Sequence, residues 1–396
     1  ALLDIDLDMQ EDFWVETESG TLEELVERAQ EAFAFIVKHG GIPSRWRSFS
    51  MITDVFLVEL ASIKFLGDSH FPCLTSIAMT FTGPDEHDDE DEFTLSEHIY
   101  SRPKLLFLEP PPKLRSIKLE GIPGPYLFGH LNHPQIVGLT CLELRFEGIY
   151  PHLVDLNKML NANPNLQTLR LGSETTFEPA EVDRKQFPSV HLPKLQSLSF
   201  IDVASPLWTL HAVTMLDVPN TTSFELTLGM TFLGDDHEEA GVRKLMDHII
   251  CDASQATLSP RFPSLRSLTL PSDMQLTFGY DIEQVLAAYP RLKELTLPKC
   301  ESLAPLLKRP WLSPDIERLR VGVKNLVQLK KVVNSRCKAG LPLHTVLVDD
   351  FDLRVRVKQS DRAQLEKYVD FALVLPDGER LNGRYWVGYE TLANFG

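Results

Sequence analysis

The chain has 396 residues, of which 43% are hydrophobic and 24% are charged, with 56 acidic and 39 basic side chains. This apolar content excludes a disordered chain, and no run approaches the roughly 20 apolar residues needed to cross a bilayer. The net charge of −17 argues against nucleic acid as the main ligand, since a phosphate backbone requires a basic footprint.

The first 45 residues are predicted to begin the fold with a cap. Residues 21–38 carry apolar side chains at helical spacing, and Thr21 followed by Glu24 forms a capping box. We therefore expect a helix here, which leads into a strand near Trp46.

An internal repeat organises residues 46–350. Residues 164–171 read P-x-L-x-x-L-x-L, and the same apolar spacing recurs along the chain. The eleven copies are Trp46/Phe49/Met51, Leu74/Ile77/Met79, Leu114/Ile117/Leu119, Leu139/Leu142/Leu144, Leu166/Leu169/Leu171, Leu195/Leu198/Phe200, Thr221/Phe224/Leu226, Leu265/Leu268/Leu270, Leu292/Leu295/Leu297, Ile316/Leu319/Val321 and Leu343/Val346/Val348. Eight of the ten intervals between successive copies measure 24 to 29 residues, which is the period of leucine-rich repeats.

Prolines at a fixed offset support this register. Eight of them stand two residues before the first patterned position, where a proline suits the turn from a helix into a strand because it cannot continue a helix. They are Pro72, Pro112, Pro164, Pro193, Pro219, Pro263, Pro290 and Pro314.

The repeat predicts an α/β fold. Each unit should contribute one short strand, and helical patterns at residues 153–160, 282–288 and 326–333 lie between strands. We expect a leucine-rich-repeat solenoid, or horseshoe, of about eleven irregular strand–helix units at residues 46–350, with a parallel sheet on its concave face. Residues 1–45 would then be the N-terminal cap and the first convex helix. An ordinary doubly wound sheet would require neither the fixed period nor the proline offset.

Two long intervals between copies hold acidic insertions, at residues 85–92 and 233–241. Insertions in a solenoid map to loops on one face, and a solvated mobile loop is the simplest interpretation. A cation site or a contact for a basic partner is the alternative. We expect no metal, because no glycine spaces the carboxylates as an EF-hand loop requires.

After Asp350 the repeat is expected to fade into a C-terminal cap at residues 351–396. The patterns there are strand-like at residues 352–357 and helix-like at residues 362–372. Terminal units of a solenoid are atypical because one of their faces meets water.

The outward positions on the strands are candidates for partner binding, since they line the concave sheet of a solenoid. The basic side chains at these positions are Arg47, Arg115, Lys118, Arg170, Arg266, Lys293, Arg318 and Arg320, and the acidic ones are Glu143, Glu225, Glu294 and Glu317. The balance of eight against four gives this strip a charge of +4 within a chain of −17. Arginines there could bind carboxylates or phosphates in bidentate fashion, although strand surfaces tolerate charged residues without any partner.

The motifs of catalysis are not found in the sequence. It contains no G-x-S-x-G elbow, no G-x-x-x-x-G-K-[ST] phosphate loop and no H-E-x-x-H zinc helix. His130 and His133 stand three residues apart, but a following proline and the lack of a nearby acidic partner favour loop residues over a metal site. We therefore expect a binding protein rather than an enzyme, with no cofactor and no metal.

Five cysteines, far apart and odd in number, indicate a reducing compartment. We expect a cytoplasmic or nuclear protein with no membrane and no nucleic acid among its partners.

The chain resembles the F-box-like leucine-rich-repeat proteins of mushroom-forming fungi. The resemblance rests on Leu3-Asp4-Ile5-Asp6-Leu7-Asp8, on Arg45-Trp46-Arg47-Ser48-Phe49-Ser50 and on the recurrent P-x-L-x-x-L-x-L units over essentially the whole chain. In that family an F-box, a helical module that docks on the adaptor of a cullin-based ubiquitin ligase, precedes the repeats. This chain departs from the family pattern because it contains no F-box.

The resemblance implies the substrate-recognition region of an F-box-type ubiquitin-ligase receptor, with a protein target on the concave face. The ligase adaptor would be bound only through an F-box outside this chain. The alternative is a leucine-rich-repeat adaptor or scaffold unconnected to ubiquitin, and an enzyme with a site in an insertion is a third possibility.

Overall fold

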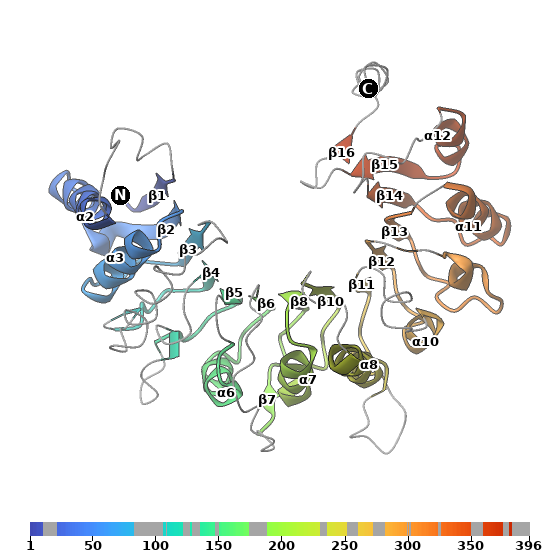
Figure 1. Cartoon of the computed structure of the whole chain (residues 1–396), viewed down its shortest axis with the longest axis horizontal. Coiled ribbons are helices and arrows are strands. Elements are labelled where there is room, and N and C mark those ends of the chain that lie inside the picture. The colour runs from blue at the N-terminus through green and yellow to red at the C-terminus, as the bar shows by residue number, and fades with distance from the viewer. Residues whose placement is uncertain are drawn as a thin grey trace. The chain divides into compact units, whose positions relative to one another are not determined.

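The computed structural model describes residues 1–10, 22–82, 106–107, 109–121, 127–128, 135–146, 150–173, 188–229, 236–251, 260–271, 282–298, 300, 302–323, 326–349, 359–374 and 380–381. The chain divides into two compact blocks, an N-terminal block (Ala1–Val218) and a C-terminal block (Pro219–Gly396). In each block short strands alternate with helices along the sequence, and the helices lie on one side of the strands (Figure 1).

In the N-terminal block seven strands follow the order β1-β2-β3-β4-β5-β6-β8, and every neighbouring pair is parallel. The strands are β1 (Leu3–Met9), β2 (Trp46–Thr53), β3 (Ser76–Phe81), β4 (Ser116–Glu120), β5 (Cys141–Phe146), β6 (Thr168–Ser173) and β8 (Ser197–Val203). The helices are α2 (Leu22–Lys38), α3 (Phe56–Gly67), α6 (Leu153–Asn161) and α7 (Pro206–Met215), with a 3₁₀ turn η1 (Pro43–Arg45). A separate parallel pair joins β7 (Val190–His191) to β9 (Leu216–Asp217).

In the C-terminal block the strand order is β10-β11-β12-β13-β14-β15-β16, parallel as far as β15, with β16 antiparallel to it. The strands are β10 (Ser223–Leu228), β11 (Ser267–Thr269), β12 (Glu294–Leu297), β13 (Arg318–Val321), β14 (Thr345–Asp349), β15 (Asp370–Val374) and β16 (Arg380–Leu381). The helices are α8 (Asp236–Ile250), α10 (Ile282–Ala288), α11 (Leu326–Lys338) and α12 (Gln359–Leu365), with a 3₁₀ turn η3 (Ala304–Leu307).

The strands that the repeat predicts are confirmed, from β2 at Trp46 to β14 at Thr345. The expected helices are confirmed as α2, α6, α10 and α11. The α/β class and the parallel sheet therefore follow from the apolar spacing, because strand–helix–strand connections of this length place successive strands side by side and parallel.

The pairing register aligns the same motif position in successive strands. In the N-terminal block Ile77, Ile117 and Leu142 are consecutive partners, and in the C-terminal block Leu268, Leu295 and Leu319 are. These six side chains are at most 1% exposed. Each strand therefore adds an equivalent layer to the core beneath the helices, and truncating one such leucine to alanine should cost about 2–5 kcal/mol.

Two strands extend the array beyond the prediction. β1 pairs with β2 and places Ile5 beside Phe49, although Leu3–Met9 was expected only as part of a cap. The predicted helix at residues 362–372 is wrong in its second half, because α12 ends at Leu365 and β15 begins at Asp370. The run Phe371-Ala372-Leu373-Val374 is buried throughout, and its aromatic and β-branched side chains favour a strand beside β14.

Several predicted segments lie outside the described residues. They are the acidic insertion at 85–92, the strand-like stretch at 352–357, His130 and His133. The insertion at 233–241 is described only from Asp236, where α8 begins, so residues 236–241 belong to a helix rather than to the expected loop.

Buried polar side chains hold the turns between helices and strands. Asn163, which is fully buried, accepts a hydrogen bond from the Leu139 amide and donates to the carbonyls of Ile136 and Met159, at 2.8–2.9 Å. Gln135 Oε1 accepts from the Leu106 amide at 2.7 Å. Such bonds satisfy backbone groups that the irregular turns would otherwise leave buried and unpaired.

Among the described helices, none combines the length and the apolar character that a membrane span needs.

Candidate functional site

The candidate site is the sheet face that the helices leave uncovered, which we call the open face. Side chains alternate along each strand, so the patterned leucines point to the helices and the residues between them point to the open face. In β12, for example, Leu295 and Leu297 are buried while Glu294 and Thr296 are partly exposed. The basic residues predicted from the sequence therefore lie at or beside strands of this face.

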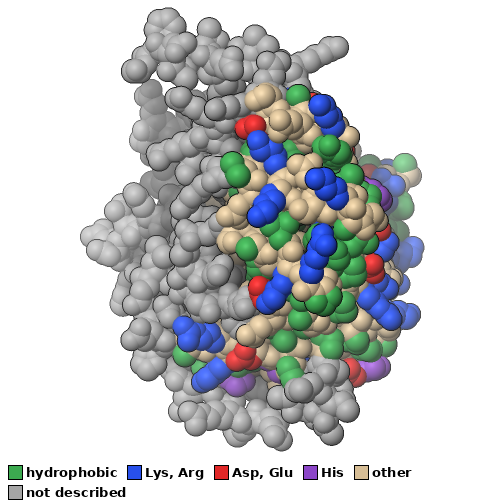
Figure 2. Space-filling view, turned by 90° about the vertical axis from the view of Figure 1, so that its right-hand side faces the viewer, with side chains coloured by type: hydrophobic (Ala, Val, Ile, Leu, Met, Phe, Trp, Pro, Cys, Tyr) green, Lys and Arg blue, Asp and Glu red, His purple; other side chains and the backbone are tan. Residues whose placement is uncertain are grey.

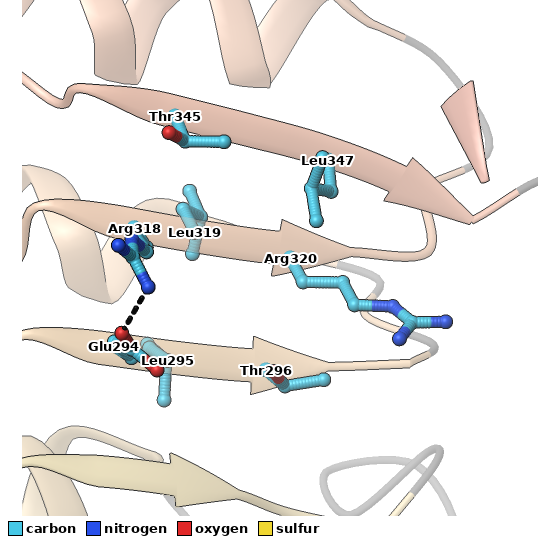
Figure 3. Close-up of a pocket in the computed structure, with 8 residues that line it drawn as sticks. All are labelled: Glu294, Leu295, Thr296, Arg318, Leu319, Arg320, Thr345 and Leu347. Atoms are coloured by element: carbon cyan, nitrogen blue, oxygen red, sulfur yellow. Dashed lines mark hydrogen bonds and ion pairs between the residues drawn. The ribbon is translucent and has the colours of Figure 1, made fainter. Parts of the chain in front are cut away.

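A pocket of about 390 Å³ lies on the open face of the C-terminal block, over β12, β13 and β14 (Figure 3). Its lining residues are Glu294, Leu295, Thr296, Arg318, Leu319, Arg320, Thr345 and Leu347. Register explains the grouping, because Arg318 has Glu294 on one neighbouring strand and Thr345 on the other. Two of the predicted basic residues, Arg318 and Arg320, are thus brought into one hollow.

Arg318 is held by an ion pair inside the pocket. Its Nη1 lies 2.7 Å from Glu294 Oε1, and the side chains are 66% and 42% exposed (Figure 3). A pair this exposed is weak, because water and salt screen it. An incoming anion can therefore compete with Glu294 for the guanidinium at little cost.

Arg320 is held differently, by a buried carboxylate. Its Nε donates to Asp349 Oδ1 at 2.7 Å, and the Asp349 side chain is only 4% exposed. Burial raises the pKa of Asp349 above the usual value, although Arg320 acts in the opposite direction, and its Oδ2 has no hydrogen-bond partner. Because the bond uses Nε, the two Nη groups of Arg320 remain for a ligand, with no hydrogen bond to a described residue.

Beside the pocket, Lys293 and Glu317 form a further ion pair, with Nζ 3.0 Å from Oε1. This contact lowers the pKa of Glu317. Arg266 lies one strand away and donates from Nη1 to the Arg291 carbonyl at 3.1 Å. Four of the predicted basic residues, Arg266, Lys293, Arg318 and Arg320, therefore belong to the C-terminal block.

The other predicted residues lie in the N-terminal block. Arg115 donates from Nη1 to the carbonyls of Leu114 and Gly138, at 2.7 and 3.3 Å, and Lys118 pairs with Glu120 at 3.3 Å. Arg170 is exposed beside its strand partner Glu143, and no ion pair joins it to a described residue. Arg115 and Lys118 belong to β4 and the turn before it, and Arg170 lies on β6, two strands away.

At the edge strand of this block, Arg47 binds Asp4 through two hydrogen bonds, and Ser48 Oγ donates to the same carboxylate at 2.6 Å. The bonds from Arg47 and then Ser48 lower the pKa of Asp4 to about 2. Asp4 is one of three carboxylates on β1 that alternate with inward apolar residues, with Asp6 and Asp8.

The open face also carries acidic residues that the repeat pattern did not include. Asp4, Glu120 and Asp349 each pair with one of the basic residues counted at +4. Asp4 lies on a strand outside the eleven copies, and the other two each lie one residue past the last patterned position. Extending the alternation of inward and outward residues to the end of each strand would have revealed Glu120 and Asp349. The positive charge of the strip is therefore largely neutralised within the chain.

In the described part of the chain, no group of three or more His, Cys, Asp or Glu side chains is arranged to hold a metal ion.

No protein-family model, curated protein or solved structure matches this chain.

Proposed function

We propose that this chain is a protein-binding module of the leucine-rich-repeat solenoid type, which holds its partner on the open face of the sheet. The observation that carries the proposal is the register, in which equivalent motif positions are paired from strand to strand within each block. Such an array buries one face under helices and presents rows of side chains on the other. Solenoids use that surface for binding.

The chemistry of the open face suits a polar partner surface. Small hydroxyl side chains form part of this face, such as the paired Ser48, Ser76 and Ser116, and charged residues in ion pairs lie beside them. Charged pairs of this kind give specificity and orientation more than affinity, since an incoming charge must exchange with the internal partner. The pocket at Arg318 and Arg320 would anchor an acidic side chain or a phosphate of the target.

The finer form of the proposal is the substrate-recognition region of an F-box-type cullin ubiquitin-ligase receptor. It is supported by the resemblance of the motifs to the F-box-like repeat proteins of mushroom-forming fungi. A receptor of this kind needs no catalytic residue, because holding the target near the ligase raises its effective concentration.

The binding role is tested by affinity capture with charge-reversed variants. R170E/R318E changes one exposed arginine on the open face of each block, and K64E/K244E changes two exposed helical lysines by the same charge. We expect the open-face variant to lose a partner that the wild type and the helical variant retain. Equal recovery by all three proteins would contradict the proposal.

The ligase role is tested separately. The complete gene product should co-purify with the ligase adaptor and cullin, whereas residues 1–396 alone should not bind the adaptor. If the complete product captures a target without adaptor or cullin, the chain is a scaffold unconnected to ubiquitin. A tight complex of residues 1–396 with the adaptor would contradict the account.

A further inference from the structure

The helical side of the C-terminal block carries a group of cations that the open face does not explain. Figure 2 looks onto this side, and Lys and Arg side chains are spread over it with few Asp or Glu between them. We call the part formed by α11, α12 and the residues after η3 the basic helical surface. Apart from Lys308, which pairs with Glu283, and Arg336, which is buried, its cations are Arg309, Lys330, Lys331, Lys338, Arg362 and Lys367.

Contacts between the elements make this one surface. Lys330 Nζ on α11 lies 2.6 Å from Asp361 Oδ1 on α12. Arg309 and Arg336 each place the guanidinium carbon 5.4 Å from the ring centre of Trp311, so the segment after η3 packs beside the C-terminal half of α11. The two helices and the turn after η3 therefore present their cations together.

Four of the six cations have no carboxylate partner. Lys330 pairs with Asp361, and Arg362 pairs with Glu366 at 2.6 Å. No ion pair joins the remaining four, Arg309, Lys331, Lys338 and Lys367, to a described residue, and all four are exposed. On the open face, by contrast, most of the basic residues predicted from the sequence form ion pairs with carboxylates.

Helix geometry aligns part of this charge. Lys331 and Lys338 are seven residues apart on α11, so they lie on the same face about two turns, or roughly 10 Å, from each other. Cations at helix C-termini stabilise the helix dipole, which is a sufficient reason for Lys338. It is no reason for Lys331, which lies in the middle of α11.

We propose that the basic helical surface binds an acidic segment of a partner protein, independently of the open face. The six cations exceed their two paired carboxylates by four, in a chain whose net charge is −17. The exposed apolar side chains of Val327 (67%) and Tyr368 (48%) border the lysines along the sequence. A segment in which Asp or Glu alternates with a few apolar residues fits both features.

The charge of the whole chain argues for a short segment over an extended polyanion. Nucleic acid or an anionic membrane would bring many phosphates to a chain whose net charge is −17, and the resulting repulsion acts over about a Debye length, roughly 10 Å. A peptide segment meets only the basic surface and avoids that repulsion.

The test uses the full chain and a fluorescein-labelled twelve-residue peptide of Glu with three Leu. The peptide with Gln in place of Glu controls for charge. K331E/K338E removes two unpaired lysines, and K64E/K244E is the matched control with the same charge change on other helices. We expect K331E/K338E to weaken peptide binding about tenfold, the control to leave it unchanged, and K331Q/K338Q to weaken it less but in the same direction.

Unchanged peptide binding by K331E/K338E and K331Q/K338Q would overturn the proposal. It would also be overturned if duplex DNA or phosphatidylserine vesicles bound the wild-type chain more tightly than the peptide and lost binding on the same substitutions. Neither result depends on the open face, because Arg170 and Arg318 are intact in every variant.

Discussion

At the scale of the residue, the open face is defined by how each cation is held. Arg318 can readily exchange its carboxylate partner for a ligand, because the Glu294 side chain is partly exposed. Arg320 is fixed by Asp349, which is buried. A buried carboxylate is costly unless it is paired, and here it holds the Arg320 guanidinium near the carboxyl ends of the strands (Figure 3). Arg318 can therefore move toward a ligand, whereas Arg320 is already held in place.

The raised pKa of Asp349 predicts a pH dependence of stability. A carboxyl group whose pKa is higher in the folded chain contributes stability fully below its unfolded value, about 3.9, and loses it as the pH rises through the folded value. The asparagine of D349N cannot titrate. The unfolding free energy of D349N minus that of the wild type should therefore increase from pH 4 to pH 7.5.

Urea unfolding at the two pH values measures this difference. D361N, which removes a carboxylate from the partly buried ion pair with Lys330, is the comparison variant. A D349N difference that stays constant or falls with pH would show that burial does not dominate at this carboxyl.

At the scale of the element, the repeats are joined by polar side chains that bond to an earlier turn. Asn163 bridges two successive turns, Gln328 Oε1 accepts from the Leu303 amide at 2.7 Å, and Arg336 reaches the carbonyls of the turn before β13. Ser313 stands at the same motif position as Asn163, three residues before the first patterned residue, and likewise bonds to residues 24 and 27 positions earlier. The array is therefore held partly by one recurring polar position and partly by bonds particular to a single turn.

Asn163 gives a prediction with a close control. N163A removes three hydrogen bonds and leaves the backbone groups of Leu139, Ile136 and Met159 buried, so it should destabilise the chain by about 2–4 kcal/mol. N165A, two residues away at an exposed position, should change stability by less than about 0.5 kcal/mol. Similar unfolding midpoints for the two variants would contradict the bridging role.

Arg336 is a second bridge, and its geometry requires a guanidinium. The side chain is 2% exposed and donates to the carbonyls of Ser313, Pro314 and Ile316, while burial lowers its pKa. R336K should destabilise nearly as much as R336A, about 2–4 kcal/mol, because an ammonium group cannot reach three carbonyls at once. Thermal unfolding of both variants against K338A, an exposed neighbour, tests this; a stable R336K chain would refute it.

These elements show how far sequence reasoning reaches. The spacing of Leu169 and Leu171, or of Leu295 and Leu297, predicted strands because burial alternates with a period of two. The spacing could not predict β15, because α12 is short and the apolar residues of the helix and of the strand follow one another closely in the sequence up to Phe371. Nor could it find the role of Asn163, because hydrogen bonds across repeats depend on turn geometry that no local pattern encodes.

At the scale of the whole molecule, net charge is a poor guide to binding. The chain is −17, yet cations without an ion pair to a described residue gather on α11, just after α12 and just after η3, whereas cations on the open face are mostly matched by carboxylates. The sequence placed Arg47, Lys118, Arg170, Arg318 and Arg320 on strands, whereas Arg115, Arg266 and Lys293 lie just before theirs. The pairing with Asp4, Glu120 and Asp349 emerged only from the fold. Two surfaces with different electrostatic characters are therefore available, one for the target of the proposed receptor and one for an acidic segment.

The central claim is that a protein partner lies on the open face, and site-specific photocrosslinking tests it most directly. A benzoylphenylalanine at Thr345, beside the pocket, is compared with one at Lys244 on the outside of α8. The account predicts that the partner recovered by affinity capture crosslinks to position 345 and not to position 244. Crosslinking at position 244 with none at 345 would place the partner on the helices and contradict the account.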